Sequence, residues 1–209
     1  MNIEVLMKDK PIILAISAAS GFILGLKTLD FLLENNYKVE LVISQNAYYI
    51  AKHEQSLALS HNANQIKQAI IAHLDKKSKA DNLKIWLNDQ IWADIASGSH
   101  KTLGMVIVPA SMSAVASIAS GLSDNLIERA ADVVIKEGRT LVIVPRETPF
   151  SSIHLENMLK LSRLGVRVVP PIAGFYTKDA TFEGMVDFVC GKVLDVFGID
   201  NDLYKRWSV

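Results

Sequence analysis

The chain has very little cysteine and no long apolar run. Cys190 is the only thiol among 209 residues, so no internal disulfide can form, which fits a reducing compartment. No apolar stretch reaches the roughly 20 residues that a membrane-spanning helix requires. Residues 1–10 also lack a signal-type region. We therefore expect a cytoplasmic protein with no membrane partner.

The chain also lacks an excess of either charge, because 22 lysines and arginines balance 22 aspartates and glutamates. Without a global positive field, nucleic acid is not an expected partner, and any cationic site must be local. The five histidines show no metal-ligand spacing with one another or with Cys190. No metal site is therefore expected.

Several motifs of common enzymes are absent. There is no Walker lysine motif and no nucleophile elbow of the hydrolase type. A dinucleotide fingerprint needs three spaced glycines and an acidic residue that closes the second strand. Residues 17–21 (SAASG) offer one glycine, and the second predicted strand ends in Ser44. This pattern disfavours NAD.

What the chain does have is a regular alternation of two patterns. Half of its residues are apolar, and short β-type runs are each followed by a helix-type pattern. The predicted strands are residues 11–17, 39–44, 105–109, 140–144 and 166–170, with a weaker candidate at 83–87. This alternation predicts one domain, residues 1–209, in which helices cover both faces of a parallel α/β sheet in three layers.

Helix signals lie between the predicted strands. Apolar residues at helical spacing predict helices at residues 22–34, 64–75, 152–164 and 181–197. Asn125 can cap a further helix that runs to about residue 137. Glu128 is placed to reach back as in a capping box, and Gly138 is placed to end that helix.

Small, hydroxyl-bearing loops follow two of the predicted strands, at residues 17–21 and 109–114 (PASMSA). The carboxyl ends of parallel strands face one crevice, and a helix that begins in a small-residue loop favours an anion. These loops are therefore candidates for a phosphate or cofactor cradle, and residues 97–99 (SGS) are a third donor-rich candidate. An ordinary tight turn explains the loop 17–21 equally well, and ordinary loop composition is the simpler explanation of each of the other two loops taken alone.

Charged and polar side chains follow other predicted strands. Arg146 and Glu147 stand at the end of residues 140–144, which pairs a cation suited to phosphate with a potential proton donor. Lys136 shares a helix face with Arg129, two turns away. Together these groups indicate a site for a phosphorylated substrate, although each alone is typical of a solvated surface.

Six segments in this order resemble the flavin prenyltransferases of the UbiX type. They are AASG at 18–21, PASM at 109–112, GLSDNLIERAAD at 121–132, PRETP at 145–149, IHLENM at 153–158 and GFY at 174–176. The resemblance implies a Rossmann-like (flavodoxin-like) sheet that binds reduced FMN, with dimethylallyl monophosphate as co-substrate and no metal. The family joins the prenyl group to flavin N5 and C6, releases phosphate, and supplies prenylated FMN to a UbiD-type decarboxylase. It also implies a homo-oligomer, a dodecamer with its sites between subunits.

The resemblance assigns roles to individual residues. Glu147 matches an acid that assists phosphate departure, Glu54 matches a carboxylate for later proton movement, and Ser20 matches a hydroxyl close to flavin N5. The implied flavin-binding set is Ala18, Ala19, Ser20, Ser44, Ser111, Met112, Ser113, Ala114 and Arg146. The implied prenyl-phosphate set is Lys136, Tyr176, Lys192, Trp207 and Trp92, in which the two tryptophans lie beside the allylic chain.

The sequence departs from the family pattern at three positions. Ala18 and Ala110 stand where many relatives have glycine and cysteine, and Lys192 stands where arginine is commonest. Lysine keeps the charge of arginine but loses its bidentate geometry, so a weaker grip on phosphate is expected.

Two alternatives are weighed against this interpretation. An FMN-dependent cysteine decarboxylase of the same fold shares the PAS signature at 109–111, but residues 112–114 break its continuation and PRETP has no role there. A non-catalytic flavin carrier would use the same pocket. Glu147 and Glu54 favour an enzyme, because binding of an anion gains nothing from two carboxylates nearby. The resemblance fits either ubiquinone biosynthesis or aromatic-acid breakdown.

Overall fold

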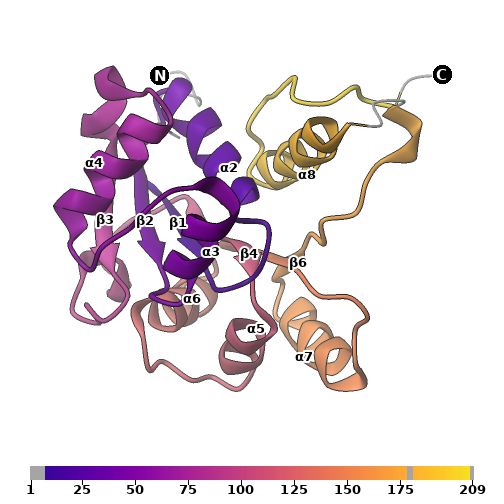
Figure 1. Cartoon of the computed structure of the whole chain (residues 1–209). Coiled ribbons are helices and arrows are strands. Elements are labelled where there is room, and N and C mark those ends of the chain that lie inside the picture. Colours follow the sequence, from indigo (N-terminus) through magenta and orange to yellow (C-terminus); the bar gives the residue numbers. More distant parts are fainter. Residues whose placement is uncertain (1–7, 178–180, 208–209) are drawn as a thin grey trace.

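Six parallel strands form the sheet of this protein, whose computed structural model describes residues 8–177 and 181–207 (Figure 1). The spatial order is β3-β2-β1-β4-β5-β6. The strands are β1 (Ile12–Ile16), β2 (Val39–Ile43), β3 (Leu83–Leu87), β4 (Gly104–Ala110), β5 (Thr140–Pro145) and β6 (Arg167–Val168). The predicted parallel sheet is confirmed, including the weaker strand, although β6 is much shorter than the pattern suggested.

Seven α-helices connect or follow these strands within the described ranges. They are α2 (Phe22–Glu34), α3 (Ala47–Gln55), α4 (Ala63–His73), α5 (Met112–Ala119), α6 (Leu126–Lys136), α7 (Ser152–Arg163) and α8 (Phe182–Val196). Short 3-10 segments add η1 (Lys77–Asn82), η2 (Asp94–Ala96) and η3 (Phe175–Thr177). Helix α3 was not predicted, because it buries only Ala47 and Ala51 and so has almost no apolar stripe.

Alternating side chains of the strands build two cores, one on each face of the sheet. In β1, Ile12, Leu14 and Ile16 pack in the core that contains residues of α2, α4 and α8. Ile13 and Ala15 belong to the other core, with residues of α5, α6 and α7. Figure 1 shows these two helix groups on either side of the strands, which makes the three predicted layers.

The cap of α6 follows the predicted pattern with one difference. The Asn125 side chain accepts a hydrogen bond from the Glu128 backbone N–H at 3.2 Å. The Glu128 carboxylate accepts from the Asp124 N–H at 3.0 Å, so it reaches one residue beyond the cap. Gly138 lies beyond the helix end with a φ of 65°, a conformation that favours glycine.

Cys190 is fully buried in α8, as its helical pattern indicated. Burial raises the pKa of its thiol to about 12, so the thiol stays protonated. Within the described ranges, no helix has the length and apolar character needed to cross a bilayer.

Candidate active site

The site lies where the strand order changes direction, between β1 and β4. β1 pairs with β2 on one side and with β4 on the other, and ligands of such sheets bind outside the carboxyl ends at this point. The Ser17 hydroxyl joins the two loops there, because it donates to the Pro109 carbonyl at 3.0 Å and accepts from the Ser111 N–H at 2.7 Å. The loops that follow β1 and β4 therefore form one wall.

A cavity of about 460 Å³, here called the smaller cavity, opens beside this wall. Its lining is mainly polar and comprises Ser17, Ala18, Ser44, Gln45, Asn46, Asn88, Ser111, Ser113, Ala114, Asn125, Ile127 and Glu128. The structure thus brings together five members of the predicted flavin set from three loops. Met112 and Ala19 belong to the same loops but not to the lining. The first turns of α5 and α6 border the cavity, and the start of α5 favours an anionic group.

One hydroxyl in the smaller cavity lacks a partner. The oxygen of Ser44 is buried, and among the described residues nothing accepts from it or donates to it. By contrast, Asn88 occupies the first N–H groups of α6, with its carbonyl accepting from Leu126 at 2.8 Å and its side-chain oxygen accepting from Ile127 at 3.1 Å. A buried hydroxyl without a partner is unfavourable in a folded protein. Ser44 therefore fits a ligand atom placed in this cavity, and the residues present fit a polar cofactor such as FMN.

A larger cavity of about 590 Å³ adjoins the second half of the loop 17–21, at Ser20 and Gly21, whereas the smaller cavity adjoins Ser17 and Ala18. It is lined by Ser20, Gly21, Ile23, Leu24, His53, Glu54, Gln55, Arg146, Pro171, Phe182, Met185 and Val186. Ser20, Glu54 and Arg146 come from separate parts of the chain and meet here, as predicted. Apolar side chains from α2 and α8 complete the wall, so the cavity suits a ligand with both an apolar and an anionic part.

Three residues that line the larger cavity were not predicted from the sequence, namely His53, Phe182 and Met185. His53 lies on α3, which was not predicted as a helix. Phe182 and Met185 lie one turn apart in the first turns of α8. Their spacing in the sequence puts both apolar side chains on one face of the predicted helix 181–197, which was the signal available for them.

Glu54 has a structural position that corrects one expectation. Its carboxylate accepts hydrogen bonds from the backbone N–H of Gly21 at 3.0 Å and of Phe22 at 2.9 Å. These are the free N–H groups at the start of α2, where the loop was expected to cradle a phosphate. The chain's own carboxylate takes that place, because a fixed anion satisfies both the donors and the helix dipole. Gly21 adopts a φ of 101°, which favours glycine at this turn.

Arg146 and Glu147 follow β5 in an exposed loop that is tied to the end of β4. The Arg146 N–H donates to the Ala110 carbonyl at 3.1 Å. Arg146 lines the larger cavity, whereas Glu147 does not line either cavity and accepts from the Thr148 N–H at 3.0 Å. The pair therefore stands at the predicted edge, with its carboxylate directed to the surface.

Lys136 does not approach Arg146 within one chain. It ends α6, which runs antiparallel to the strands, so it lies at the amino edge of the sheet near residues 97–99. Its ammonium pairs with Glu137 at 2.6 Å. The expectation that residues 97–99 share the crevice was wrong. Lys136 lies shortly before β5 and residues 97–99 lie shortly before β4, so both are at the amino edge of the parallel sheet.

Three members of the prenyl-phosphate set gather beside α8 and its neighbouring segments. The rings of Tyr176 and Trp207 meet edge to face at 5.3 Å between centroids, and the Lys192 ammonium lies 5.8 Å from the ring of Tyr204. Trp207 is 71% exposed. Trp92, 75% exposed, follows the edge strand β3 at the far side of the sheet, so within one chain it does not join them.

The sequence matches a family model and several known proteins along most of its length. A model of the Flavoprotein family matches residues 2–194. A protein named flavin prenyltransferase UbiX from Halalkalibacterium halodurans is 42% identical over 193 residues, 92% of this chain and 91% of the relative. A protein of the same name from Methanocaldococcus jannaschii is 43% identical over 197 residues, 94% of this chain and 98% of the relative.

Solved structures show the same relationship. A crystal structure of AnUbiX in complex with FMN and dimethylallyl pyrophosphate has a TM-score of 0.84 and 36% identity, covering 96% of this chain and 98% of that chain. A dodecameric FMN-dependent UbiX-like decarboxylase from Escherichia coli O157:H7 has a TM-score of 0.83 and 38% identity, covering 95% and 100%. A PPC decarboxylase mutant has a TM-score of 0.56 and 18% identity, covering 78% and 82%, so it shows the fold alone.

Proposed function

The chain belongs to the Flavoprotein family and to its flavin prenyltransferases of the UbiX type, and we propose that it makes prenylated FMN. In this reaction the dimethylallyl group of dimethylallyl monophosphate is joined to N5 and C6 of reduced FMN, and phosphate leaves. The observation that carries this proposal is the pair of cavities whose linings both include residues of the loop 17–21. One is polar with an unpartnered Ser44 hydroxyl, and the other combines Arg146 and Glu54 with an apolar wall.

The smaller cavity would hold the polar part of FMN. Ser44, Ser111, Ser113 and the first turn of α5 offer hydroxyl and backbone donors there, and Ala18 keeps the wall close to the ligand. Met112 and Ala19 support the same loops. When bound, reduced FMN supplies the nucleophilic atoms of the reaction. The Ser20 hydroxyl, in the larger cavity, would lie close to N5.

The charges of the larger cavity match the change of charge during bond cleavage. Breaking the allylic C–O bond places positive charge on carbon and negative charge on phosphate. Arg146 would stabilise the phosphate, and the ring faces of aromatic residues would stabilise the allylic cation. Glu147 does not line the cavity of a single chain, so we propose that it protonates the leaving phosphate where a neighbouring protomer completes the site. Glu54, held by the N–H groups of α2, is a fixed carboxylate that can accept a proton afterwards.

A homo-oligomer would complete the site. Lys136 and Trp92 are exposed and remote from Arg146 within one chain, so we propose that they reach a site on a neighbouring protomer. At that shared site the prenyl phosphate would be bound by the residues gathered beside α8, namely Tyr176, Lys192 and Trp207. The dodecameric relative supports an assembly of this size for the present chain.

We further propose that residues 1–209 form a single flavoprotein domain that acts in the cytoplasm, without a metal. The product passes to a UbiD-type decarboxylase, because a modified flavin has no use without an enzyme that takes it as cofactor. The cysteine decarboxylase alternative is not proposed, since that similarity extends to the fold alone.

Replacement of Glu147 by Gln tests whether the protein is an enzyme or a flavin carrier. We expect FMN affinity to change by less than about twofold, because Glu147 does not line either cavity. Loss of the proton donor should lower turnover by about 10²-fold or more. Isothermal titration gives the affinity, and the rate of flavin modification gives turnover.

Glu156→Gln is the matched control, since it removes an exposed carboxylate from α7. Full activity in Glu147→Gln would support the carrier and count against the enzyme.

A further inference from the structure

The side of α8 that bears Lys192 holds a hub of hydrogen bonds centred on Asp195. This carboxylate binds groups from its own helix and from the chain segment 201–207. It accepts from the Tyr204 hydroxyl at 2.5 Å, from Arg206 at 2.8 and 3.2 Å, from Asn201 at 3.0 Å and from Lys192 at 3.4 Å. Three of these five contacts come from charged donor groups, and Asp195 is the acceptor common to all of them.

The segment 201–207 lies directly on the backbone of α8. A Cβ added to Gly191 would stand 2.7 Å from a ring carbon of Tyr204 and 2.8 Å from the side-chain oxygen of Asn201. The Asn201 amide also donates to the Gly191 carbonyl at 3.3 Å. Glycine therefore permits a close approach here, and the hub holds the segment in it.

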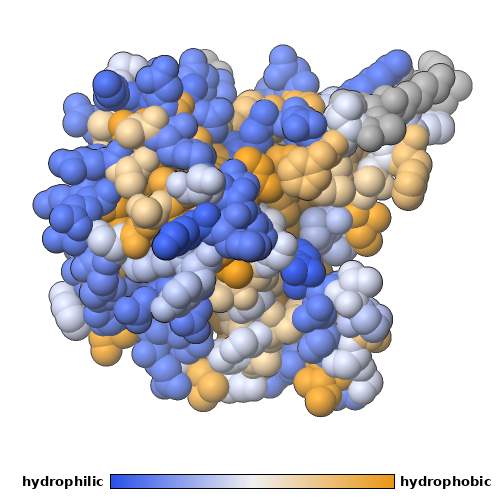
Figure 2. Space-filling view, viewed as in Figure 1, coloured by the Kyte–Doolittle hydropathy of each residue, from blue (hydrophilic) through white to orange (hydrophobic). Residues whose placement is uncertain are grey.

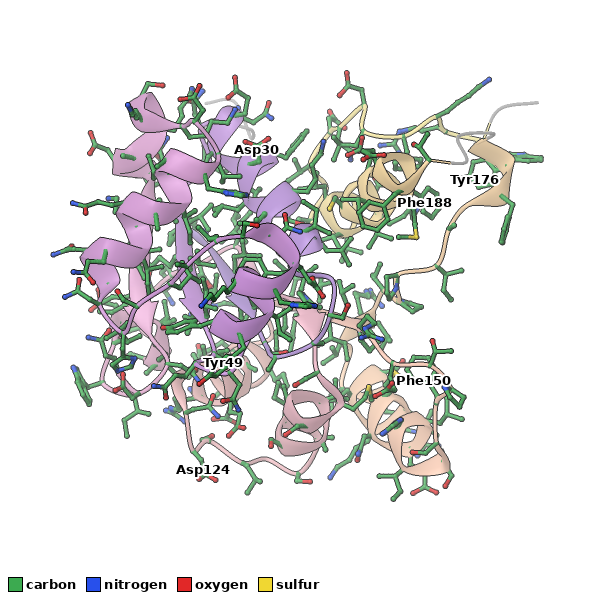
Figure 3. All side chains as sticks on the ribbon, viewed as in Figure 1. Asp30, Tyr49, Asp124, Phe150, Tyr176 and Phe188 are labelled. Carbon is green, nitrogen blue, oxygen red and sulfur yellow. The ribbon has the colours of Figure 1, made fainter. Side chains whose placement is uncertain are left out.

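A chain of aromatic contacts leads from the hub to the predicted substrate-binding residues. The ring of Tyr204 meets Phe188 of α8 at 5.1 Å, Phe188 meets Tyr176 at 6.0 Å, and Tyr176 meets Trp207 at 5.3 Å, all edge to face. A Cβ on Gly174 would stand 2.6 Å from the Phe188 ring, so the segment before Tyr176 also packs on this helix. Figure 3 shows Tyr176 and Phe188 beside α8, and Figure 2 shows apolar surface gathered over the same region.

The hub leaves the Lys192 ammonium available to bind a ligand. Partial burial raises the pKa of Asp195, but hydrogen bonds from Arg206, Tyr204 and Asn201 outweigh it and lower the pKa to about 2. Arg206 meets this carboxylate with two N–H groups, whereas the Lys192 contact is the longest of the five. The Lys192 side chain is 46% exposed. Its charge can therefore turn to a ligand without leaving Asp195 unpaired.

We propose that Asp195 is a positioning residue for the prenyl-phosphate end of the site. It fixes segment 201–207 on α8, and through that segment it places Trp207 against Tyr176 and sets the direction of Lys192. Asp195 itself does not touch the substrate. This role rests on the proposed function, because it concerns residues assigned to the prenyl phosphate, and it adds a determinant of affinity for that substrate.

Kinetics of Asp195→Asn and Asp195→Ala test the role in binding. We expect the KM for dimethylallyl monophosphate to rise about tenfold in Asp195→Ala and less in Asp195→Asn, since the carboxamide can keep some contacts. The kcat should stay within about threefold and the FMN affinity within about twofold of the parent values. An unchanged KM, or equal losses in FMN affinity and KM, would overturn the proposal.

Asp187→Asn is the control on the same helix. Asp187 pairs with Lys27 of α2 at 2.7 Å and makes no contact in the hub. A general loosening of α8 would raise the KM in this variant as well. A rise confined to Asp195 variants, with partial rescue by Asp195→Glu, supports a specific role.

Limited trypsin digestion tests whether the hub holds segment 201–207 on α8, and it does not depend on enzyme activity. Cleavage after Lys205 and Arg206 should be about tenfold faster in Asp195→Ala than in the parent or in Asp187→Asn. Tyr204→Phe, which removes one hydroxyl and keeps the ring, should give an intermediate rate. Equal cleavage rates in all variants would show that the hub does not hold segment 201–207, even if the parent protein failed to modify FMN. A parent that modifies FMN, with an Asp195 variant of unchanged KM, would refute only the positioning role.

Discussion

Ser44 is the residue whose surroundings carry most information about a ligand. Its hydroxyl oxygen is buried beside the smaller cavity and has no partner among the described residues. A polar group buried in this way destabilises the ligand-free protein by roughly 1–3 kcal/mol and is satisfied by a hydrogen bond from a ligand. The sequence predicted Ser44 as a flavin contact through resemblance, and the structure adds this physical reason.

Replacement of Ser44 by Ala should therefore separate stability from binding. We expect the free energy of unfolding of the FMN-free protein to stay equal or to rise by up to about 1 kcal/mol, while FMN affinity falls about five- to tenfold. Urea unfolding and isothermal titration measure the two quantities. Ser117→Ala, on α5 and outside both cavities, is the control. A less stable variant with full FMN affinity would contradict this account of Ser44.

The placement of Lys136 shows how far residue-level prediction extends. Helical spacing placed Lys136 and Arg129 on one face of α6, but spacing does not tell which end of the sheet a residue reaches. The strand β5 begins four residues after Lys136, and that short connection fixes Lys136 at the amino edge. This clue was present in the sequence. Contacts with a neighbouring protomer, in contrast, depend on surfaces that periodicity does not describe.

At the scale of elements, α3 is the helix that brings Glu54 to the start of α2. Prediction from sequence missed it because the helix is short, its second half is polar, and its only buried residues are two alanines. Its stability comes from tertiary contacts, among them the two hydrogen bonds between the Glu54 carboxylate and the N–H groups of Gly21 and Phe22.

Glu54→Gln should weaken this contact between the two helices. A neutral amide accepts these hydrogen bonds less strongly and loses the attraction to the helix dipole, so we expect the free energy of unfolding to fall by about 1 kcal/mol. Chemical denaturation at neutral pH measures the change. Glu156→Gln, an exposed substitution on α7, should have no effect. If both variants unfold alike, the carboxylate of Glu54 does not stabilise α2.

The attachment of segment 201–207 to α8 should depend on pH. The pKa of Asp195 in the folded protein is about 2, below its ordinary value of 3.8, so its stabilising effect is complete above about pH 4 and is lost as the pH falls towards 2. Because the ion pair between Asp195 and Arg206 is partly solvated, we expect the Asp195 carboxylate to add about 1 kcal/mol to the free energy of unfolding at neutral pH. The difference in free energy of unfolding between the parent and Asp195→Asn should be equal at pH 7 and pH 5 and smaller at pH 3. A difference that grows on acidification would contradict this assignment.

At the scale of the whole molecule, the sheet was predictable because its central strands are buried on both faces. Their near-continuous apolar runs, such as residues 12–16, stand out between polar helical patterns. The ends were less predictable. β6 keeps two residues, which pair with Val142 and Ile143 of β5, whereas the other edge strand, β3, keeps five. The order of the strands follows from the packing of helices, which single apolar runs do not encode.

The two cavities also belong to this scale, because each draws on loops and helices that are far apart in the sequence. Loop composition indicated that residues 17–21 and 109–114 face one crevice, and the structure confirms that arrangement. The apolar wall from the first turns of α8 could not be read from composition. It depends on how α8 packs against α2 after a long connection from β6.

Prenylation of FMN by this protein can be measured from the mass and absorption of the extracted flavin. The purified protein is incubated anaerobically with reduced FMN and dimethylallyl monophosphate, without added metal, before the extraction. We expect a flavin heavier than FMN by one five-carbon prenyl unit, with an altered absorption spectrum, and an equal amount of released phosphate. Unmodified FMN after exhaustive incubation, from protein that binds FMN, would contradict it.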